Sequence, residues 1–241
     1  MISPLATLRS IALEQPETIR VFENFQLDYC CGGNRPLAEA CAEKGLAVDD
    51  VLSSLKGAAA NKAETKTGLE NATLTVVIRH IVETHHAFIR AELPPLDFMA
   101  HKVAGKHGPN HPEVLVVERN LEQLGEELLS HLMKEESILF PYIEGLERSQ
   151  QGAEPPHACF GSVESPIRMM IMEHEGAAAL LEEMRKATNG FTPWEGACPT
   201  SAGLLYRMAE FERDLHRHVH LENNLLFPRA VELEKAMLAT R

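Results

Sequence analysis

One pattern of twelve residues occurs twice in the amino-acid sequence, at residues 130–141 and again at residues 217–228. Each copy has a histidine, a glutamate four residues later, and a Phe-Pro pair that starts five residues after the glutamate. The shared residues are His131, Glu135 and Phe140-Pro141 in the first copy, and His218, Glu222 and Phe227-Pro228 in the second, an offset of 218 − 131 = 87. Positions i and i+4 lie on the same face of a helix, so each copy places an imidazole beside a carboxylate. Two such pairs facing each other predict a metal site with nitrogen and oxygen ligands.

A single His-x-x-x-Glu pattern on a helix is usually a solvated surface pair without a metal. The repeat argues against it, because the two copies keep the polar pair and an apolar frame. Between them, Met133 is replaced by His220 and Lys134 by Leu221. A polar pair kept within an apolar stripe is expected to be buried, and a buried carboxylate needs a cation.

The elements that must position these residues are predicted to be four long helices. Apolar periodicity places them at about residues 73–92, 112–146, 166–188 and 201–238. Pro94-Pro95 is expected to interrupt the first, and residues 101–112 are expected to form an irregular loop. His86 and His174 are separated by 174 − 86 = 88 residues, within one of the repeat offset, so every helix carries an inward histidine. The predicted fold is all-α, an antiparallel four-helix bundle preceded by a small helical domain.

The number of candidate ligands indicates two metal ions. A structural zinc site takes four ligands, often thiolates. Here six residues are available, with one loop histidine as a seventh: His86, His131, Glu135, His174, His218 and Glu222. Imidazole with carboxylate suits iron, with manganese as the less favoured choice. The two glutamates can each bridge the ions, which predicts a carboxylate-bridged di-iron site.

Other histidines and glutamates near these ligands are expected to have lesser roles. His85 would point about 100° away from His86 and belongs at the surface or in a second layer around the metal. His80 is expected to pack or to cap. His216 and His220 are expected to be solvent-exposed, with a zinc site as the alternative. Glu136 and Glu173, each next to a ligand, are expected to be outward charges, or else to form the second layer.

The N-terminal part of the chain has a different character. Residues 1–56 are predicted to form a small helical domain that contains Asp28-Tyr-Cys-Cys-Gly-Gly33, followed by a linker at 57–70 and the bundle at 71–241. Cys30 and Cys31 are expected to form an exposed, flexible thiol pair; the alternative is one packed and one idle thiol. Five cysteines without a CxxC pair indicate reduced thiols in the cytoplasm. Cys41, Cys159 and Cys198 are expected to be structural or incidental.

Charge and hydropathy exclude two classes of partner. The net charge is −12 over 241 residues. Since no basic patch offsets it, a nucleic-acid partner is not expected. No apolar run of about 18 residues predicts a membrane span, and no signal segment is present at the N-terminus. A cytoplasmic protein without a membrane or nucleic-acid partner is therefore expected.

The combination of these motifs resembles the repair-of-iron-centres family. The ligand set His86, His131-x-x-x-Glu135, His174 and His218-x-x-x-Glu222 is similar to that of the family's hemerythrin-like domain, and Asp28-Tyr-Cys-Cys-Gly-Gly33 is similar to the signature of its small domain. The family also has a histidine after a Lys-Val pair, which His107 matches, with His101 and His111 as rivals.

The resemblance implies a function and a set of partners. It implies a stress-response protein that repairs iron–sulfur clusters damaged by oxidation or nitric oxide, with two oxo-bridged and carboxylate-bridged iron ions. Damaged iron–sulfur proteins would be its partners, and Cys30 and Cys31 would have a redox or iron-handling role. Alternatives are an O2-binding or NO-binding sensor, and an enzyme that reduces nitric oxide. A monomer and a homodimer are both consistent with the sequence.

Overall fold

The structure is a computed structural model that describes residues 2–60, 68–157 and 160–239. Within these ranges every regular element is a helix, and the one β-bridge is an isolated pair of Thr7 and Pro36. The chain forms two compact units, one of residues 1–77 and 216–241 and the other of residues 78–215. The divisions fall inside α5 (Leu74–His80) and α10 (Pro199–Leu221), each of which is a continuous helix.

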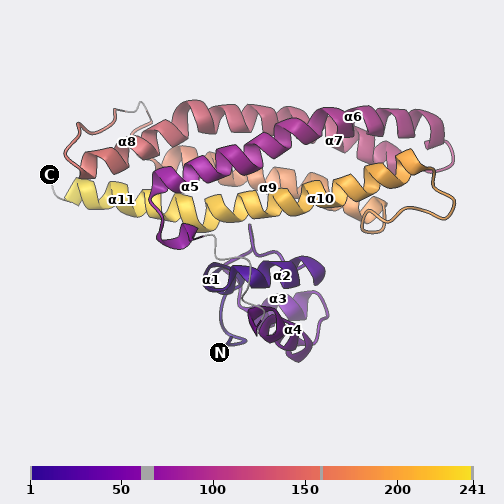
Figure 1. The fold of residues 1–241 in the computed structure, drawn as a ribbon, viewed down its shortest axis with the longest axis horizontal. Helices are drawn as coiled ribbons and strands as arrows, with labels where there is room; N and C mark the ends of the chain where they lie inside the picture. The colour runs from indigo at the N-terminus through magenta and orange to yellow at the C-terminus, as the bar shows by residue number, and fades with distance from the viewer. Residues whose placement is uncertain (1, 61–67, 158–159, 240–241) are drawn as a thin grey trace. The chain divides into compact units, whose positions relative to one another are not determined.

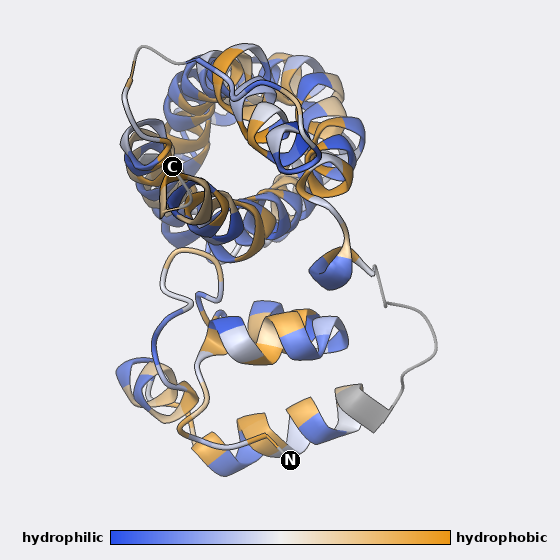
Figure 2. Ribbon diagram, turned by 90° about the vertical axis from the view of Figure 1, so that its left-hand side faces the viewer, coloured by the Kyte–Doolittle hydropathy of each residue, from blue (hydrophilic) through white to orange (hydrophobic). Residues whose placement is uncertain are grey.

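The first unit contains the small helical domain. Its helices are α1 (Leu8–Glu14), η1 (Pro16–Thr18), α2 (Ile19–Asn24), α3 (Leu37–Glu43) and α4 (Val48–Ala60). The Thr7 hydroxyl accepts a hydrogen bond from Ser10 N at 3.1 Å and caps α1. Each helix turns an apolar side inward (Figure 2), and the core includes Leu8, Phe22, Tyr29, Leu37 and Leu55. Of the predicted linker at 57–70, residues 61–67 lie outside the described residues; the domain boundaries stay a prediction.

The second unit is a bundle of long helices. It contains η3 (Ile81–His86), α6 (Ala87–His107), α7 (Glu113–Lys134), η4 (Glu135–Leu139), α8 (Phe140–Gln150), α9 (Glu164–Ala187) and most of α10. Figure 1 shows α6, α7, α9 and α10 running alongside one another, and α7 packs on both α6 and α9. The predicted four-helix bundle is therefore confirmed. None of the described helices is both long and apolar enough to cross a bilayer.

The first long helix differs from its prediction. Pro94 and Pro95 lie inside α6, which continues to His107, so most of the predicted loop at 101–112 is helical. A proline inside a helix removes a backbone hydrogen bond and normally costs about 3 kcal/mol. Here the adjacent Leu93 and Leu96 are buried in the bundle, and this packing outweighs the local preference.

The repeated sequence produces a repeated backbone feature. In each copy the glutamate begins a π-helical turn, η4 at Glu135–Leu139 and η5 (Glu222–Leu226). The N–H of Phe140 donates to the carbonyl of Glu135, and the N–H of Phe227 donates to that of Glu222, five residues back in each case. The following proline has no N–H to restore the normal α-helical bond. The Phe-Pro pair thus ends each π-turn, and α8 and α11 (Phe227–Ala239) continue from it. Such turns often occur at functional sites.

Candidate metal centre

The carboxylate of Glu135 is fully buried in the bundle. Its Oε2 lies 3.4 Å from His86 Nε2 and 3.4 Å from His131 Nε2. Among the described residues, neither carboxylate oxygen has a hydrogen-bond partner. A buried carboxylate without a hydrogen bond is costly unless a cation compensates its charge. The lone pairs that Glu135 leaves free are therefore suited to a metal ion.

The two imidazoles beside Glu135 are held by carboxylates on their other nitrogen. His86 Nδ1 lies 2.7 Å from Glu136, and His131 Nδ1 lies 2.8 Å from Glu173. Ligating histidines commonly donate their second N–H to a carboxylate, which leaves the first nitrogen as a lone-pair donor. Glu136 and Glu173 accordingly support the two imidazoles from behind. This matches the second of the two roles expected for them, a second layer around the metal site, and not the role of outward charges.

Both carboxylates of this second layer stay ionised. Burial acts to raise the pKa of Glu136, but hydrogen bonds from Arg90 and His86 outweigh it and hold the pKa below its usual value. Burial likewise acts to raise the pKa of Glu173, and hydrogen bonds from Lys134 and His131 lower it below the usual value. Because Glu136 and Glu173 are ionised, they accept hydrogen bonds from His86 and His131 and keep the imidazole protons on Nδ1.

His174 adds a third imidazole to this region. Its Nε2 lies 3.1 Å from His131 Nε2, and both side chains are almost completely buried. Because His131 uses Nδ1 for Glu173, its Nε2 carries a lone pair when the ring is neutral. Two Nε2 atoms directed at each other suit two imidazoles that share a cation.

The second copy of the repeat supplies the matching pair. His218 Nε2 lies 2.9 Å from Glu222 Oε1, and both side chains are fully buried. The i, i+4 spacing places them one turn apart on α10 and the start of η5.

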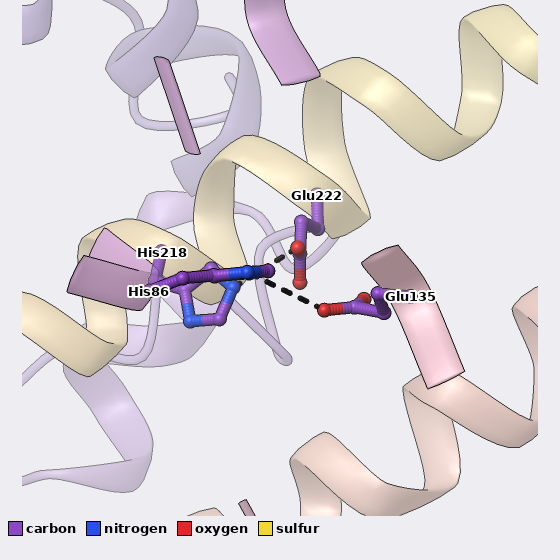
Figure 3. A group of neighbouring side chains, drawn as sticks. All are labelled: His86, Glu135, His218 and Glu222. Carbon is purple, nitrogen blue, oxygen red and sulfur yellow. Dashed lines mark hydrogen bonds and ion pairs between the residues drawn. The ribbon is translucent and has the colours of Figure 1, made fainter. Parts of the chain in front are cut away.

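These six residues form two groups with metal-ligand character. In one, the ligand atoms of His86, Glu135, His218 and Glu222 all lie within 4.8 Å of one another (Figure 3). In the other, those of His131, Glu135, His174 and Glu222 meet the same limit. Each group has two imidazoles, and both groups share the same two carboxylates. This set of imidazole and carboxylate donors suits a metal ion such as iron.

His107 does not belong to either group, which corrects the expected loop ligand. His86 and His107 are 21 residues apart along continuous helical backbone, which corresponds to about 31 Å. His107 Nε2 instead lies 3.5 Å from Cys198 Sγ, and its ring lies 5.6 Å from that of Trp194. The expectation came from the family resemblance and placed His107 in a loop, whereas α6 continues to His107.

The rival loop histidines lie elsewhere as well. His111 stacks on Trp194 with ring centroids 4.0 Å apart, and its Nδ1 lies 3.0 Å from Glu113. His101 Nδ1 lies 2.8 Å from Glu118, and its side chain is 85% exposed.

Cys198 lies among hydrogen-bond partners that favour its thiolate, a feature that the sequence did not indicate. It precedes α10, and its Sγ lies 3.2 Å from the hydroxyl of Ser201. Hydrogen bonds from Ser201, with a further one from His107, lower the pKa of Cys198 to about 6. Cys41, in contrast, is buried in the core of the small domain. Cys159 lies outside the described residues.

The loop that carries Cys30 and Cys31 is built around Asp28. The Asp28 carboxylate accepts hydrogen bonds from the N–H groups of Cys30 (3.1 Å), Cys31 (2.9 Å) and Gly32 (2.8 Å). A side chain at Gly33 would approach the Tyr29 carbonyl to 2.5 Å, so the backbone there has room only for glycine.

The thiol pair is less open than the sequence suggested. Cys30 is 5% exposed and Cys31 is partly exposed, with their Sγ atoms 4.0 Å apart. A hydrogen bond with Cys31, burial and the charge of Asp28 raise the pKa of the Cys30 thiol well above its usual value. The loop therefore shields Cys30.

Two further histidines are buried, contrary to a surface role. His85 is 5% exposed, and its Nδ1 lies 3.0 Å from Asp214. His220 is 3% exposed and lies beside the carbonyl of Tyr29. Burial lowers the pKa of His220 to about 4, so the ring is neutral. The expected solvent exposure of His220 was wrong, because the small domain covers it.

Comparison with known proteins identifies the class to which this bundle belongs. Residues 77–230 match the family described as "Hemerythrin HHE cation binding domain", and residues 5–59 match a "Domain of Unknown function (DUF542)". The chain therefore belongs to the hemerythrin HHE family, which confirms the resemblance seen in the sequence.

Individual relatives are similar over almost the whole chain. The iron-sulfur cluster repair protein YtfE of Pectobacterium atrosepticum is 36% identical over 95% of this chain and 97% of its own length. The protein of the same name from Yersinia pseudotuberculosis is 36% identical over the same shares. That of Escherichia coli is 38% identical over 93% of this chain and 96% of its own length.

Proposed function

We propose that this protein repairs iron–sulfur clusters damaged by oxidative or nitrosative stress, using a di-iron centre. The observation that carries the proposal is the pair of buried groups that share Glu135 and Glu222, with two imidazoles in each group. Such a donor set holds two adjacent ions, one for each pair of histidines. The relatives named as iron-sulfur cluster repair proteins support the same role.

Each ligand has a defined part in this proposal. His86 and His218 would hold one ion, and His131 and His174 the other, with Glu135 and Glu222 shared. Two iron ions held there would supply exchangeable iron and redox chemistry. Glu136 and Glu173 keep the protons of His86 and His131 on Nδ1, so that Nε2 is available to the metal. Damaged iron–sulfur proteins are the proposed partners, and a cytoplasmic location belongs to the same proposal.

The test begins with iron content and the visible spectrum. The protein is loaded anaerobically with ferrous iron, and iron per chain is measured after desalting. Two ions per chain and, after oxidation, the absorption of an oxo-bridged pair are expected. One ion per chain would contradict a site with two groups. Glu135→Gln is expected to lose both ions, because Glu135 belongs to both groups, whereas exposed Glu175→Gln on α9 serves as the matched control.

The second step measures repair itself. An iron–sulfur enzyme is inactivated with nitric oxide or peroxide and then incubated with the loaded protein. Recovery of its activity is expected with the wild-type protein and with Glu175→Gln, but not with Glu135→Gln. Reversible O2 binding without recovery would favour a sensor, and catalytic nitrous oxide formation would favour nitric oxide reduction. Undiminished repair by a Cys30→Ala, Cys31→Ala variant would exclude a relay through these thiols.

A further inference from the structure

The two copies of the repeat differ at two positions on one helix face. His220 and Asn224 in the second copy are 3% and 5% exposed. Their counterparts in the first copy are Met133 (220 − 133 = 87) and Ser137 (224 − 137 = 87), and both are exposed. The second copy therefore has buried polar residues at two positions where the first copy faces solvent.

These residues are buried by the loop that carries the vicinal cysteines, which belongs to the same unit. Asn224 Nδ2 lies 3.1 Å from the carbonyl of Cys30, 3.2 Å from that of Tyr29 and 3.0 Å from His220 Nδ1. Arg9 donates from Nη2 to the carbonyl of Asn224 at 2.9 Å. The side-chain amide of Asn224 thus donates to two successive backbone carbonyls of the loop, those of Tyr29 and Cys30.

Asn224 also lies in the π-turn that begins with a candidate metal ligand. Glu222 starts η5, and Asn224 follows it by two residues. A cation bound by His218 and Glu222 would fix this turn. Removing the cation would leave two buried carboxylates, Glu135 and Glu222, close together in one group without a metal charge between them. Movement of the turn to relieve this cost would displace Asn224.

We infer that Asn224 is a positioning residue that couples metal occupancy to the accessibility of the Cys30–Cys31 pair. With metal bound, Asn224 holds the loop and Cys30 stays shielded; without metal, the loop is released and the thiols become accessible. The inference rests on the proposed metal centre. Coupling of this kind is reciprocal at equilibrium, so release of the loop lowers the metal affinity by the same factor.

The experiment measures alkylation of Cys30 and Cys31 by iodoacetamide in the full chain. Protein is compared metal-free and loaded anaerobically with ferrous iron, and the modified cysteines are identified by peptide mass spectrometry. In the wild-type protein, metal-free Cys30 is expected to react about fivefold faster or more, the lower end of typical coupling.

The decisive variant is Asn224→Ser, which introduces the residue that the first copy uses in its own π-turn. In this variant Cys30 is expected to react fast with and without iron, so the ratio falls to about one. Its iron dissociation, followed with a chelator, is expected to be faster than in the wild-type protein. Ser137→Ala in the first copy is the matched control and is expected to keep the wild-type ratio.

A second variant tests whether any weakened contact between the small domain and α10 would have the same effect as the loss of Asn224. Arg217 donates to the Glu23 carboxylate from Nε and Nη2, each at 3.0 Å, outside the π-turn. Glu23→Gln is expected to weaken this contact but keep a clear difference between metal-free and loaded protein. A ratio of one in Glu23→Gln, or a wild-type ratio in Asn224→Ser, would overturn the role of Asn224.

Iron content distinguishes this inference from the proposed function. If the wild-type protein takes up no iron, the metal centre fails and the coupling fails with it. If it binds iron but Cys30 reacts at the same rate in both forms, the coupling alone fails.

Discussion

At the scale of single residues, the proposed metal centre also depends on side chains outside its ligand set. Glu173 accepts hydrogen bonds from His131 and Lys134, and it stays ionised despite partial burial. Replacing it with Gln removes the charge that holds the Nδ1 proton. We expect Glu173→Gln to lower iron affinity about 10- to 100-fold, measured by competition with a chelator. Exposed Glu175→Gln on the same helix is the control, and an equal loss in both would contradict a specific role for Glu173.

Cys198 leads to a prediction about pH. Because its pKa is lowered to about 6, its thiolate predominates above that pH. We expect its alkylation rate to rise through about pH 6 and to be near its plateau at neutral pH. Burial raises the pKa of Cys41, so that thiol should still react slowly there. His107→Ala should shift the Cys198 profile to higher pH and leave iron content unchanged. Loss of iron in that variant would return His107 to the ligand set.

At the scale of elements, the helices of the bundle are fixed by buried charges as well as by apolar packing. Glu212 on α10 is 3% exposed, and Arg185 on α9 donates from Nε to its two carboxylate oxygens at 2.7 and 2.9 Å. Removing one partner leaves the other partly buried and unpaired. We expect Glu212→Ala to lower the free energy of unfolding by about 2–4 kcal/mol.

Denaturant unfolding of the metal-free protein measures this cost. The control is Glu210→Ala, two residues away on the same helix, where the side chain is 68% exposed. Its effect should stay within about 0.5 kcal/mol. Similar losses in the two variants would show that the Arg185–Glu212 pair does not fix α10.

At the scale of the whole molecule, we expect metal binding to raise stability through the buried carboxylates. Free iron at about 1,000 times its dissociation constant should stabilise the folded protein by about 4 kcal/mol. Glu135→Gln removes a fully buried charge that has no hydrogen-bond partner among the described residues. We therefore expect this variant to be more stable than the wild-type protein without metal, yet to gain much less from iron.

Thermal unfolding with and without ferrous iron tests both effects. For a protein of this size, each kcal/mol corresponds to about 2–4 °C in Tm. Glu175→Gln should follow the wild-type protein in both conditions. A metal-free Glu135→Gln protein that melts below the wild-type protein would contradict the argument that the buried Glu135 carboxylate is destabilising without a cation.

The sequence alone determined which residues of the two repeat copies correspond and which residues share a helix face. The 87-residue offset identifies His131 with His218 and Glu135 with Glu222, and helix periodicity places each pair on one face. These relations are local or internal to the repeat, so they need no knowledge of distant contacts. The all-helical fold follows for the same reason.

Only the tertiary structure decided the features that depend on neighbours distant in sequence. Packing of Leu93 and Leu96 carries α6 through two prolines and removes His107 from the ligands. Glu173 becomes a partner of His131 because α7 packs on α9. Asn224 is buried by a loop almost 200 residues earlier in the chain, at a separation of 194 residues from Cys30. Local propensity and periodicity do not predict such contacts, because the energy of these contacts comes from surfaces that meet only after folding.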